Sequence, residues 1–295
     1  MRVARLRAGG SEVTAVERDG RWFAVEPADG EGPVSPLAAL GGAGVVSARP
    51  LEGDSGLAVP WRPPRNVLCL GKNFREHAEE FAAYAGEKES APAHPIVFTK
   101  APDALCGAED AIEVQRDLAA ALDYEVELGV VIGRGGASIE PGAAAAHIAG
   151  YTIVNDITAR DLQERHRQWF LGKSLPAASP TGPVLVSPDE LPALADCAIE
   201  SRVNGEVRQT SRLGDMIFGI AETIAIVSAI VPLRRGDLIS MGTPSGVGIG
   251  FTPPRFLEDG DEVVCEIEGI GRLRNVVRVV EAAVAAPEAA EGRGW

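Results

Sequence analysis

Two glutamates stand two residues apart in an otherwise apolar segment. Glu125 and Glu127 lie in segment 123–132, which reads Asp-Tyr-Glu-Val-Glu-Leu-Gly-Val-Val-Ile. Because side chains alternate across a β-strand, both carboxylates would share one face, with their Cα atoms roughly 6.5 to 7 Å apart. The apolar run is typical of a buried strand, and burying two unpaired carboxylates costs several kcal/mol. A solvated strand face is the alternative, but the pattern favours a cation between the two side chains.

A third carboxylate, Asp156, ends the predicted strand 150–156. Three carboxylates could form half of an oxygen shell around a divalent ion, leaving positions for water and a chelating substrate. Alternatively, Asp156 caps the turn that follows it. The four histidines are dispersed and the four cysteines form no CxxC pair, so zinc is disfavoured. Oxygen ligands favour Mg²⁺ or Mn²⁺, with Ca²⁺ as a further candidate.

An imidazole and a carboxylate stand three residues apart at His77 and Glu80. On a helix they would face the same way, which suits a carboxylate that orients an imidazole for proton transfer. A solvated charged helix is the alternative. The next residues, 81–93, mix Ala, Gly, Glu and Lys with little apolar periodicity. We therefore expect a mobile lid there.

Two glycine-containing segments resemble nucleotide-binding motifs but fail them. Segment 172–174, Gly-Lys-Ser, would need a glycine where Arg167 stands to form a P-loop. Segment 242–248, Gly-Thr-Pro-Ser-Gly-Val-Gly, would need a glycine where Phe251 stands to form a dinucleotide-binding turn. Dense glycines still expose backbone N–H groups, which suit a substrate carboxylate. A tight hairpin without a ligand is the alternative.

The composition predicts a mixed, mostly β protein. With 34 glycines and 21 prolines, many turns and short strands are expected. The Pro-rich segment 60–64 suggests a boundary between a small N-terminal β-rich domain, residues 1–60, and a catalytic domain, residues 65–281. Apolar residues at helical spacing predict a core helix over 215–231. The Ala- and Glu-rich end, 282–295, is expected to be a flexible tail.

The charge balance limits the partners of the protein. A formal charge of −14 repels nucleic acid and anionic membranes. No segment reaches the ~18 apolar residues that a membrane span needs, and the N-terminus shows no apolar signal core. We therefore expect a cytoplasmic protein with a small-molecule substrate and no nucleic-acid or membrane partner.

Taken in order, these segments resemble the fumarylacetoacetate hydrolase family over about residues 65–280. Each motif alone is weak, but the collinear set is specific. The matching segments are 71–74 with His77 and Glu80, 124–128, 155–161, 172–174, 203–206, 214–217, 236–237, 242–248 and 260–261.

The resemblance implies a β-sandwich or roll, usually a homodimer, acting on 2-oxo acids that bear a second carbonyl or an enol. It assigns Glu125, Glu127 and Asp156 to a divalent cation, normally Mg²⁺ or Mn²⁺. It assigns His77 and Glu80 to water activation and Lys173 to the charge that develops on the substrate. The substrate-binding set is Thr243, Gly242, Arg160 and Gln163.

The first expectation for function is a metal-dependent hydrolase that cleaves a C–C bond in a 2,4-dioxo acid such as an acylpyruvate or fumarylacetoacetate. An isomerase, a decarboxylase of oxaloacetate or a 2-hydroxy-dienedioate, and a catalytically silent binding protein stay open, because the motifs are shared among them. One departure concerns the pocket wall, since Pro176 stands where many members have an aspartate.

Overall fold

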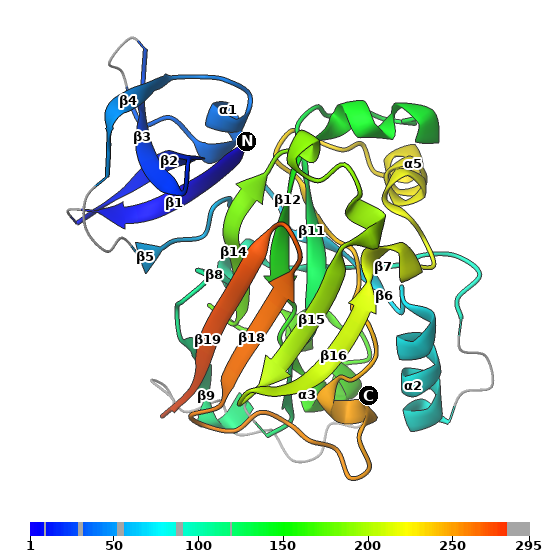
Figure 1. Ribbon diagram of the computed structural model, residues 1–295. Coiled ribbons are helices and arrows are strands. Elements are labelled where there is room, and N and C mark those ends of the chain that lie inside the picture. Colours follow the sequence, from blue (N-terminus) through cyan, green and yellow to red (C-terminus); the bar gives the residue numbers. More distant parts are fainter. Residues whose placement is uncertain (9, 29–31, 52–55, 87–90, 119, 282–295) are drawn as a thin grey trace.

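Two β-sheets packed face to face form the body of the protein in this computed structural model, which describes residues 1–8, 10–28, 32–51, 56–86, 91–118 and 120–281 (Figure 1). The larger sheet runs in the order β4 (Val45–Pro50), β3 (Arg21–Glu26), β2 (Ser11–Arg18), β1 (Arg2–Ala8), β14 (Ser179–Val186), β12 (Ile148–Asn155), β11 (Val126–Ile132), β17 (Leu238–Ser240), β6 (Val67–Gly71) and β7 (Ile96–Lys100). Two short strands pair with interior strands of this sheet, β5 (Gly56–Leu57) with β1 and β8 (Leu105–Cys106) with β14. The predicted mostly β fold is confirmed.

The second sheet and the helices complete the fold. The sheet runs in the order β16 (Glu206–Arg212), β15 (Ala198–Val203), β18 (Glu262–Ile267), β19 (Gly271–Val280) and β9 (Ile112–Gln115), and β10 (Leu122–Asp123) pairs separately with β13 (Thr158–Ala159). The α-helices are α1 (Pro36–Leu40), α2 (Arg75–Ala85), α3 (Arg160–Arg165), α4 (Phe170–Lys173) and α5 (Ile220–Ile230). Short 3₁₀ helices cover Pro102–Ala104, Arg116–Leu118, Pro141–His147, Pro188–Glu190, Leu194–Asp196, Leu213–Asp215 and Gly248–Gly250. None of the helices in the described ranges is long and apolar enough to cross a membrane.

The main core fills the space between the two sheets. Leu128 and Ile153 contribute from the larger sheet, and Ile199, Val263 and Leu273 contribute from the smaller one. Each of these side chains is at most 1% exposed. Every residue of β11 is buried, as expected of a strand covered on both faces. Any polar side chain on this strand therefore lies in a dry environment.

The pairing of β11 with β12 brings the predicted carboxylates together. The two strands are antiparallel, with Val126 opposite Asn155 and Glu127 opposite Val154. Asp156 follows Asn155 directly, and its backbone N–H donates to the carbonyl of Glu125 at 2.8 Å. The end of one strand and the start of the other thus place three acidic residues at one point of the sheet.

The N-terminal strands continue the larger sheet. β1 joins β14 through two residue pairs, Arg2 with Val186 and Val3 with Leu185. Beyond this junction β1 to β4 surround a small core of their own, made of Val3, Val16, Val25 and Ala39. The proposed boundary near residue 60 stays a prediction, and the predicted tail, 282–295, lies outside the described residues.

The predicted helix over 215–231 is shorter than expected and begins at Ile220. Tertiary hydrogen bonds hold the preceding residues out of the helix. The backbone N–H of Ile217 donates to the carbonyl of Asn73 at 2.7 Å, and that of Phe218 donates to the Asn73 side chain at 2.8 Å. Because this partner is about 145 residues away in the chain, local periodicity could not place the helix start. The helix expected around His77 and Glu80 is present as α2.

Truncating the core should cost stability according to burial. Ile153 is 0% exposed, so Ile153→Ala should lower the free energy of unfolding by about 2 to 5 kcal/mol. Ile230, 80% exposed at the end of α5, is the matched control, and Ile230→Ala should cost about 0.5 kcal/mol or less. Urea denaturation measures both changes. Similar losses for the two variants would contradict this account of the core.

Candidate active site

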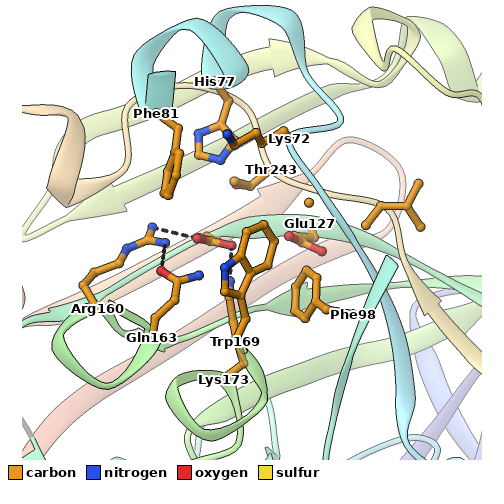
Figure 2. Close-up of a pocket in the computed structure, with 13 residues that line it drawn as sticks. Lys72, His77, Phe81, Phe98, Glu127, Arg160, Gln163, Trp169, Lys173 and Thr243 are labelled. Atoms are coloured by element: carbon orange, nitrogen blue, oxygen red, sulfur yellow. Dashed lines mark hydrogen bonds and ion pairs between the residues drawn. The ribbon is translucent and has the colours of Figure 1, made fainter. Parts of the chain in front are cut away.

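A narrow cavity lies beneath α2, over the ends of the central strands (Figure 2). Its volume is about 20 Å³, which is room for little more than one water molecule. A ligand larger than about one water molecule does not fit this conformation of the cavity. The lining residues are Leu70, Gly71, Lys72, His77, Phe81, Phe98, Glu125, Glu127, Arg160, Gln163, Trp169, Lys173 and Thr243.

Seven of the ten residues predicted from the sequence line this cavity. They are His77, Glu125, Glu127, Arg160, Gln163, Lys173 and Thr243. The other three, Glu80, Asp156 and Gly242, lie behind them and contact them directly. The sequence therefore selected residues that the fold brings to one place, whereas their individual roles stay predictions.

The three acidic residues form a compact oxygen cluster on the cavity floor. One ligand oxygen from each of Glu125, Glu127 and Asp156 lies within 4.8 Å of the others. All three side chains are buried, at 4%, 1% and 1% exposure. Carboxylate oxygens at this spacing suit a hard divalent cation. The alternative reading of Asp156 as a helix cap fails, because lysine side chains contact its carboxylate.

Two buried lysines neutralise part of the cluster. Lys173, on α4, places its Nζ 2.6 Å from Glu125 Oε2 and 2.8 Å from Asp156 Oδ2. Lys100, the last residue of β7, donates to Asp156 and, at 2.9 Å, to the carbonyl of Ile157. Sequence reasoning missed Lys100. The only available signal was a lysine that ends the strand Ile-Val-Phe-Thr-Lys, whose buried end would need an acidic partner.

The two glutamates ionise very differently. Burial opposes ionisation of Glu125, but Lys173 and Arg160 outweigh it and lower its pKa to about 2. Burial, with the nearby charges of Asp156 and Glu125, raises the pKa of Glu127 to about 8. Ser240 and the Gly242 N–H donate to Glu127 Oε2 at 2.5 and 3.1 Å without reversing that shift. The positive charge of a divalent cation would stabilise the ionised form of Glu127, so the residues fit such an ion.

The imidazole of His77 and the carboxylate of Glu80 form the expected pair. Nδ1 of His77 lies 3.3 Å from Glu80 Oε2. Glu80 also accepts from the backbone N–H of Gly246, at 3.1 Å to the nearer oxygen. A Cβ at Gly250 would overlap the Glu80 carboxylate, so a larger residue there would displace Glu80. Helix α2 is therefore docked on the glycine-containing loop 242–250.

A further contact holds the end of α2 over the cavity. The Tyr84 hydroxyl donates to Glu164 of α3 at 2.7 Å. The expected lid over 81–93 is thus partly helical, because α2 continues to Ala85. Residues 87–90 of that expectation lie outside the described residues. Whether this segment moves stays a prediction.

Arg160 and Gln163 lie side by side at the start of α3 (Figure 2). Arg160 donates from Nη1 to Gln163 Oε1 at 3.1 Å and from Nε to Asp123 Oδ2 at 2.8 Å. Its Nη2 lies 2.7 Å from Glu125 Oε1, within ion-pair distance but without an aligned hydrogen bond. Nη2 also lies 2.8 Å from Asp123 Oδ2, so this nitrogen faces two carboxylates of the protein. Sequence reasoning missed Asp123.

Thr243 and Gly242 hold the strand ends in register. The Thr243 hydroxyl donates to the carbonyl of Val126 at 2.9 Å and accepts from Gln209 Nε2 at 2.7 Å. The Gly242 N–H donates to Glu127, so in this structure it does not face a substrate carboxylate. Gly242 has φ +88°, and a Cβ there would lie 2.7 Å from that of Asn73. Only glycine combines this backbone conformation with so close an approach.

Aromatic side chains and a further lysine form the rest of the wall. The Lys72 ammonium lies 4.6 Å from the centroid of the Phe81 ring, and Phe98 packs edge-on against Trp169. A Cβ at Gly71 would overlap the Trp169 ring. Phe98 and Trp169 belong to no spaced motif, and Lys72 lies in the matching segment 71–74 but received no predicted role there. The last predicted feature, Pro176, is exposed and lies outside the lining of this cavity, and its effect on the pocket wall stays a prediction.

Comparisons with known proteins agree with this arrangement. The family model described as Fumarylacetoacetate (FAA) hydrolase C-terminal matches residues 66–278. Over 216 residues the chain is 48% identical to the oxaloacetate tautomerase YisK of Bacillus subtilis (strain 168), covering 73% of this chain and 70% of that protein.

Solved structures show the same fold. A fumarylacetoacetate hydrolase from Exiguobacterium antarcticum superposes with a TM-score of 0.82 at 38% identity, covering 95% of this chain and all of that one. A 2-hydroxyhepta-2,4-diene-1,7-dioate isomerase from Mycobacterium marinum superposes with a TM-score of 0.75 at 31% identity, covering 95% of this chain and 98% of that one. Proteins named for different reactions thus share the fold.

Metal binding should release a proton from Glu127. Because its pKa is about 8 without the ion, Glu127 is mostly protonated at pH 7 and must ionise to become a ligand. We expect release of close to one proton per Mg²⁺ or Mn²⁺ at pH 7, little at pH 9, and affinity that rises between these values. Titration calorimetry in buffers of different ionisation enthalpy measures this release.

Two glutamine variants test the assignment of that proton. Glu127→Gln should abolish tight metal binding, whereas Glu113→Gln, at an exposed residue of β9, should leave it unchanged. Unchanged binding in Glu127→Gln, or binding at pH 7 without proton release, would contradict the proposed ligand set.

Proposed function

Because the chain belongs to the fumarylacetoacetate hydrolase family, we propose that it is a metal-dependent enzyme that interconverts the keto and enol forms of a small 2-oxo dicarboxylic acid such as oxaloacetate. The observation that carries this proposal is a carboxylate cluster, with a histidine–glutamate pair above it, in one closed cavity. The 48% identity to an oxaloacetate tautomerase favours this isomerase alternative over the C–C hydrolase expected first.

The proposed cofactor is Mg²⁺ or Mn²⁺ held by Glu125, Glu127 and Asp156. Members of the family typically depend on a divalent metal, and the donor set fits one. When bound, such an ion supplies electrophilic stabilisation for the carboxylate and 2-oxo oxygens of the substrate. Arg160 and Gln163, beside this cluster, are placed to bind and orient the same carboxylate.

The proton transfer falls to His77. Burial opposes the charge of Lys173, but Asp156 and Glu125 outweigh it and raise its pKa well above the ordinary value. Lys173 therefore stays an ammonium group and offsets negative charge on the substrate oxygen. Among the described residues that line the cavity, His77 is the imidazole, a group that can both accept and donate a proton. Held by Glu80, it can take the proton from C3 and return that proton to the 2-oxo oxygen, which completes the enol.

The charge of the cavity lining supports a dianion. Three cationic side chains, Lys72, Arg160 and Lys173, line it. Interconversion of keto and enol forms moves protons only and consumes no water. A dicarboxylic acid would place one carboxylate near Arg160 and the second toward Lys72.

Hydrolysis of a 2,4-dioxo acid is the second candidate. The same His77–Glu80 pair could activate a water molecule, and the closed cavity has room for about one. The likeness to a fumarylacetoacetate hydrolase from Exiguobacterium antarcticum supports this alternative. Turnover of the enol of oxaloacetate and of an acylpyruvate, with and without Mg²⁺, distinguishes the two reactions.

Removing the imidazole should abolish most proton transfer. His77→Ala should lower kcat for enol-to-keto conversion by roughly 10²- to 10⁴-fold while leaving metal affinity intact, because His77 is not a predicted ligand. The exposed His94 provides the control variant His94→Ala, which should behave as wild type. Absorbance of the oxaloacetate enol follows the reaction. Wild-type hydrolysis of acylpyruvates without enol conversion would overturn the proposal in favour of the second candidate.

Removing the Lys72 charge should raise the KM of dianionic substrates more than that of monoanionic ones. Lys72→Met should raise KM for oxaloacetate about 10-fold or more, the worth of a charge-assisted hydrogen bond, with little change in kcat. The KM of a monoanionic 2-oxo acid should change less than about 2-fold on the same reasoning. Lys72→Arg, which keeps the charge, should restore most of the affinity. Equal effects on both substrates would show that Lys72 does not recognise the second carboxylate.

A further inference from the structure

We propose that Asp123 is a positioning residue that fixes the Arg160 guanidinium and the turn at Gly248 and Ile249 as one unit. Its effect on turnover rests on the proposed function, but its effect on anion binding can be measured without turnover. Asp123 is 0% exposed and belongs neither to the cavity lining nor to the predicted metal ligands.

The carboxylate of Asp123 is surrounded by donors. Its Oδ1 accepts from the backbone N–H groups of Tyr124 at 2.9 Å and Gly248 at 2.6 Å. Its Oδ2 accepts from the backbone N–H of Ile249 at 3.1 Å and from Arg160 Nε at 2.8 Å. Arg160 Nη2 also lies 2.8 Å from Oδ2. Every contact requires an acceptor, so an amide at this position would turn its NH₂ group toward at least one donor.

Strand pairing explains how Asp123 reaches Arg160. β10 pairs with β13, with Leu122 opposite Ala159 and Asp123 opposite Thr158. Because α3 begins directly after β13, Arg160 starts the helix beside the carboxylate. Asp123 thus fixes the orientation of the long Arg160 side chain in the absence of substrate.

The second group of contacts reaches the proton-transfer side of the cavity. Gly248 and Ile249 lie in the turn that ends at Gly250, which packs against the carboxylate of Glu80. The same loop holds Glu80 through the backbone N–H of Gly246. One buried carboxylate therefore connects the residue placed to bind the substrate carboxylate with the loop that supports the His77–Glu80 pair.

The first experiment compares Asp123→Asn with a matched control. Asp237, at 1% exposure, also accepts from an arginine, Arg65, at 2.9 Å and from a backbone N–H, that of Arg234, at 2.7 Å. It lies outside the cavity lining. Both substitutions should lower thermal stability. Asp123→Asn alone should weaken binding of oxalate to the Mg²⁺-loaded protein, measured by calorimetry, by about 10-fold or more, with metal affinity unchanged.

The second experiment asks whether the effect passes through Arg160. If it does, Asp123→Asn should weaken oxalate binding much less in an Arg160→Gln background than in wild type, because the group it positions is gone. Additive losses in this double-mutant cycle, or equal losses for Asp123→Asn and Asp237→Asn, would overturn the proposal. Asp123→Glu keeps the charge and moves it by one methylene, and serves if the asparagine variant does not fold. Unchanged oxalate affinity in Asp123→Glu would also overturn it.

Kinetics keeps this inference distinct from the proposed function. With oxaloacetate, Asp123→Asn should raise KM as well as lower kcat, whereas a general loss of folded protein would lower the apparent kcat alone. If the wild type does not convert oxaloacetate but the oxalate cycle is non-additive, the proposed reaction fails and the role of Asp123 stands. If the wild type converts oxaloacetate but the oxalate cycle is additive, the role of Asp123 fails and the proposed reaction stands.

Discussion

The rest of the structure depends on a cluster of charges buried where the central strands end. Four carboxylates (Asp123, Glu125, Glu127 and Asp156) face three cations (Lys100, Arg160 and Lys173), and every member is at most 4% exposed. With Glu127 protonated at pH 7 the net charge of the cluster is zero, and with Glu127 ionised, as a metal ligand must be, it is −1. Removing ions from water is costly, so such a cluster persists only where a rigid framework fixes each pair. Two packed sheets provide that framework, and a divalent ion would turn the balance to +1, which suits the arrival of an anion.

Much of the candidate site could be predicted because its residues occur in local patterns. The spacing of Glu125 and Glu127 indicates the alternation of side chains along a strand, and the spacing of His77 and Glu80 indicates one turn of a helix. Asp156 is harder to place, because its closeness to the glutamates depends on the pairing of β11 with β12. The family resemblance joined these separate signals into one site and also predicted the fold.

The remaining residues could not be predicted, because their partners are distant in the chain. Lys100 and Asp123 are single charged residues whose meaning appears only when the strands pair and Asp156 and Arg160 come beside them. The start of α5 could not be predicted for the same reason, because hydrogen bonds to Asn73 keep the preceding residues out of the helix. Local sequence periodicity predicts which face of a strand or helix a residue occupies, but not which distant residue it contacts. Such patterns therefore predict the residues that carry the chemistry of this site better than they predict the side chains that hold those residues in place.

The close packing of Gly71 against Trp169 constrains how the cavity can change over evolutionary time. A side chain at position 71 would overlap the indole, so a substitution there requires Trp169 to move or to be replaced. A smaller residue at position 169 would enlarge the cavity and leave position 71 free to vary and reshape the wall. A lineage that acquired a bulkier substrate by this route would pass through a roomier and less selective ancestor.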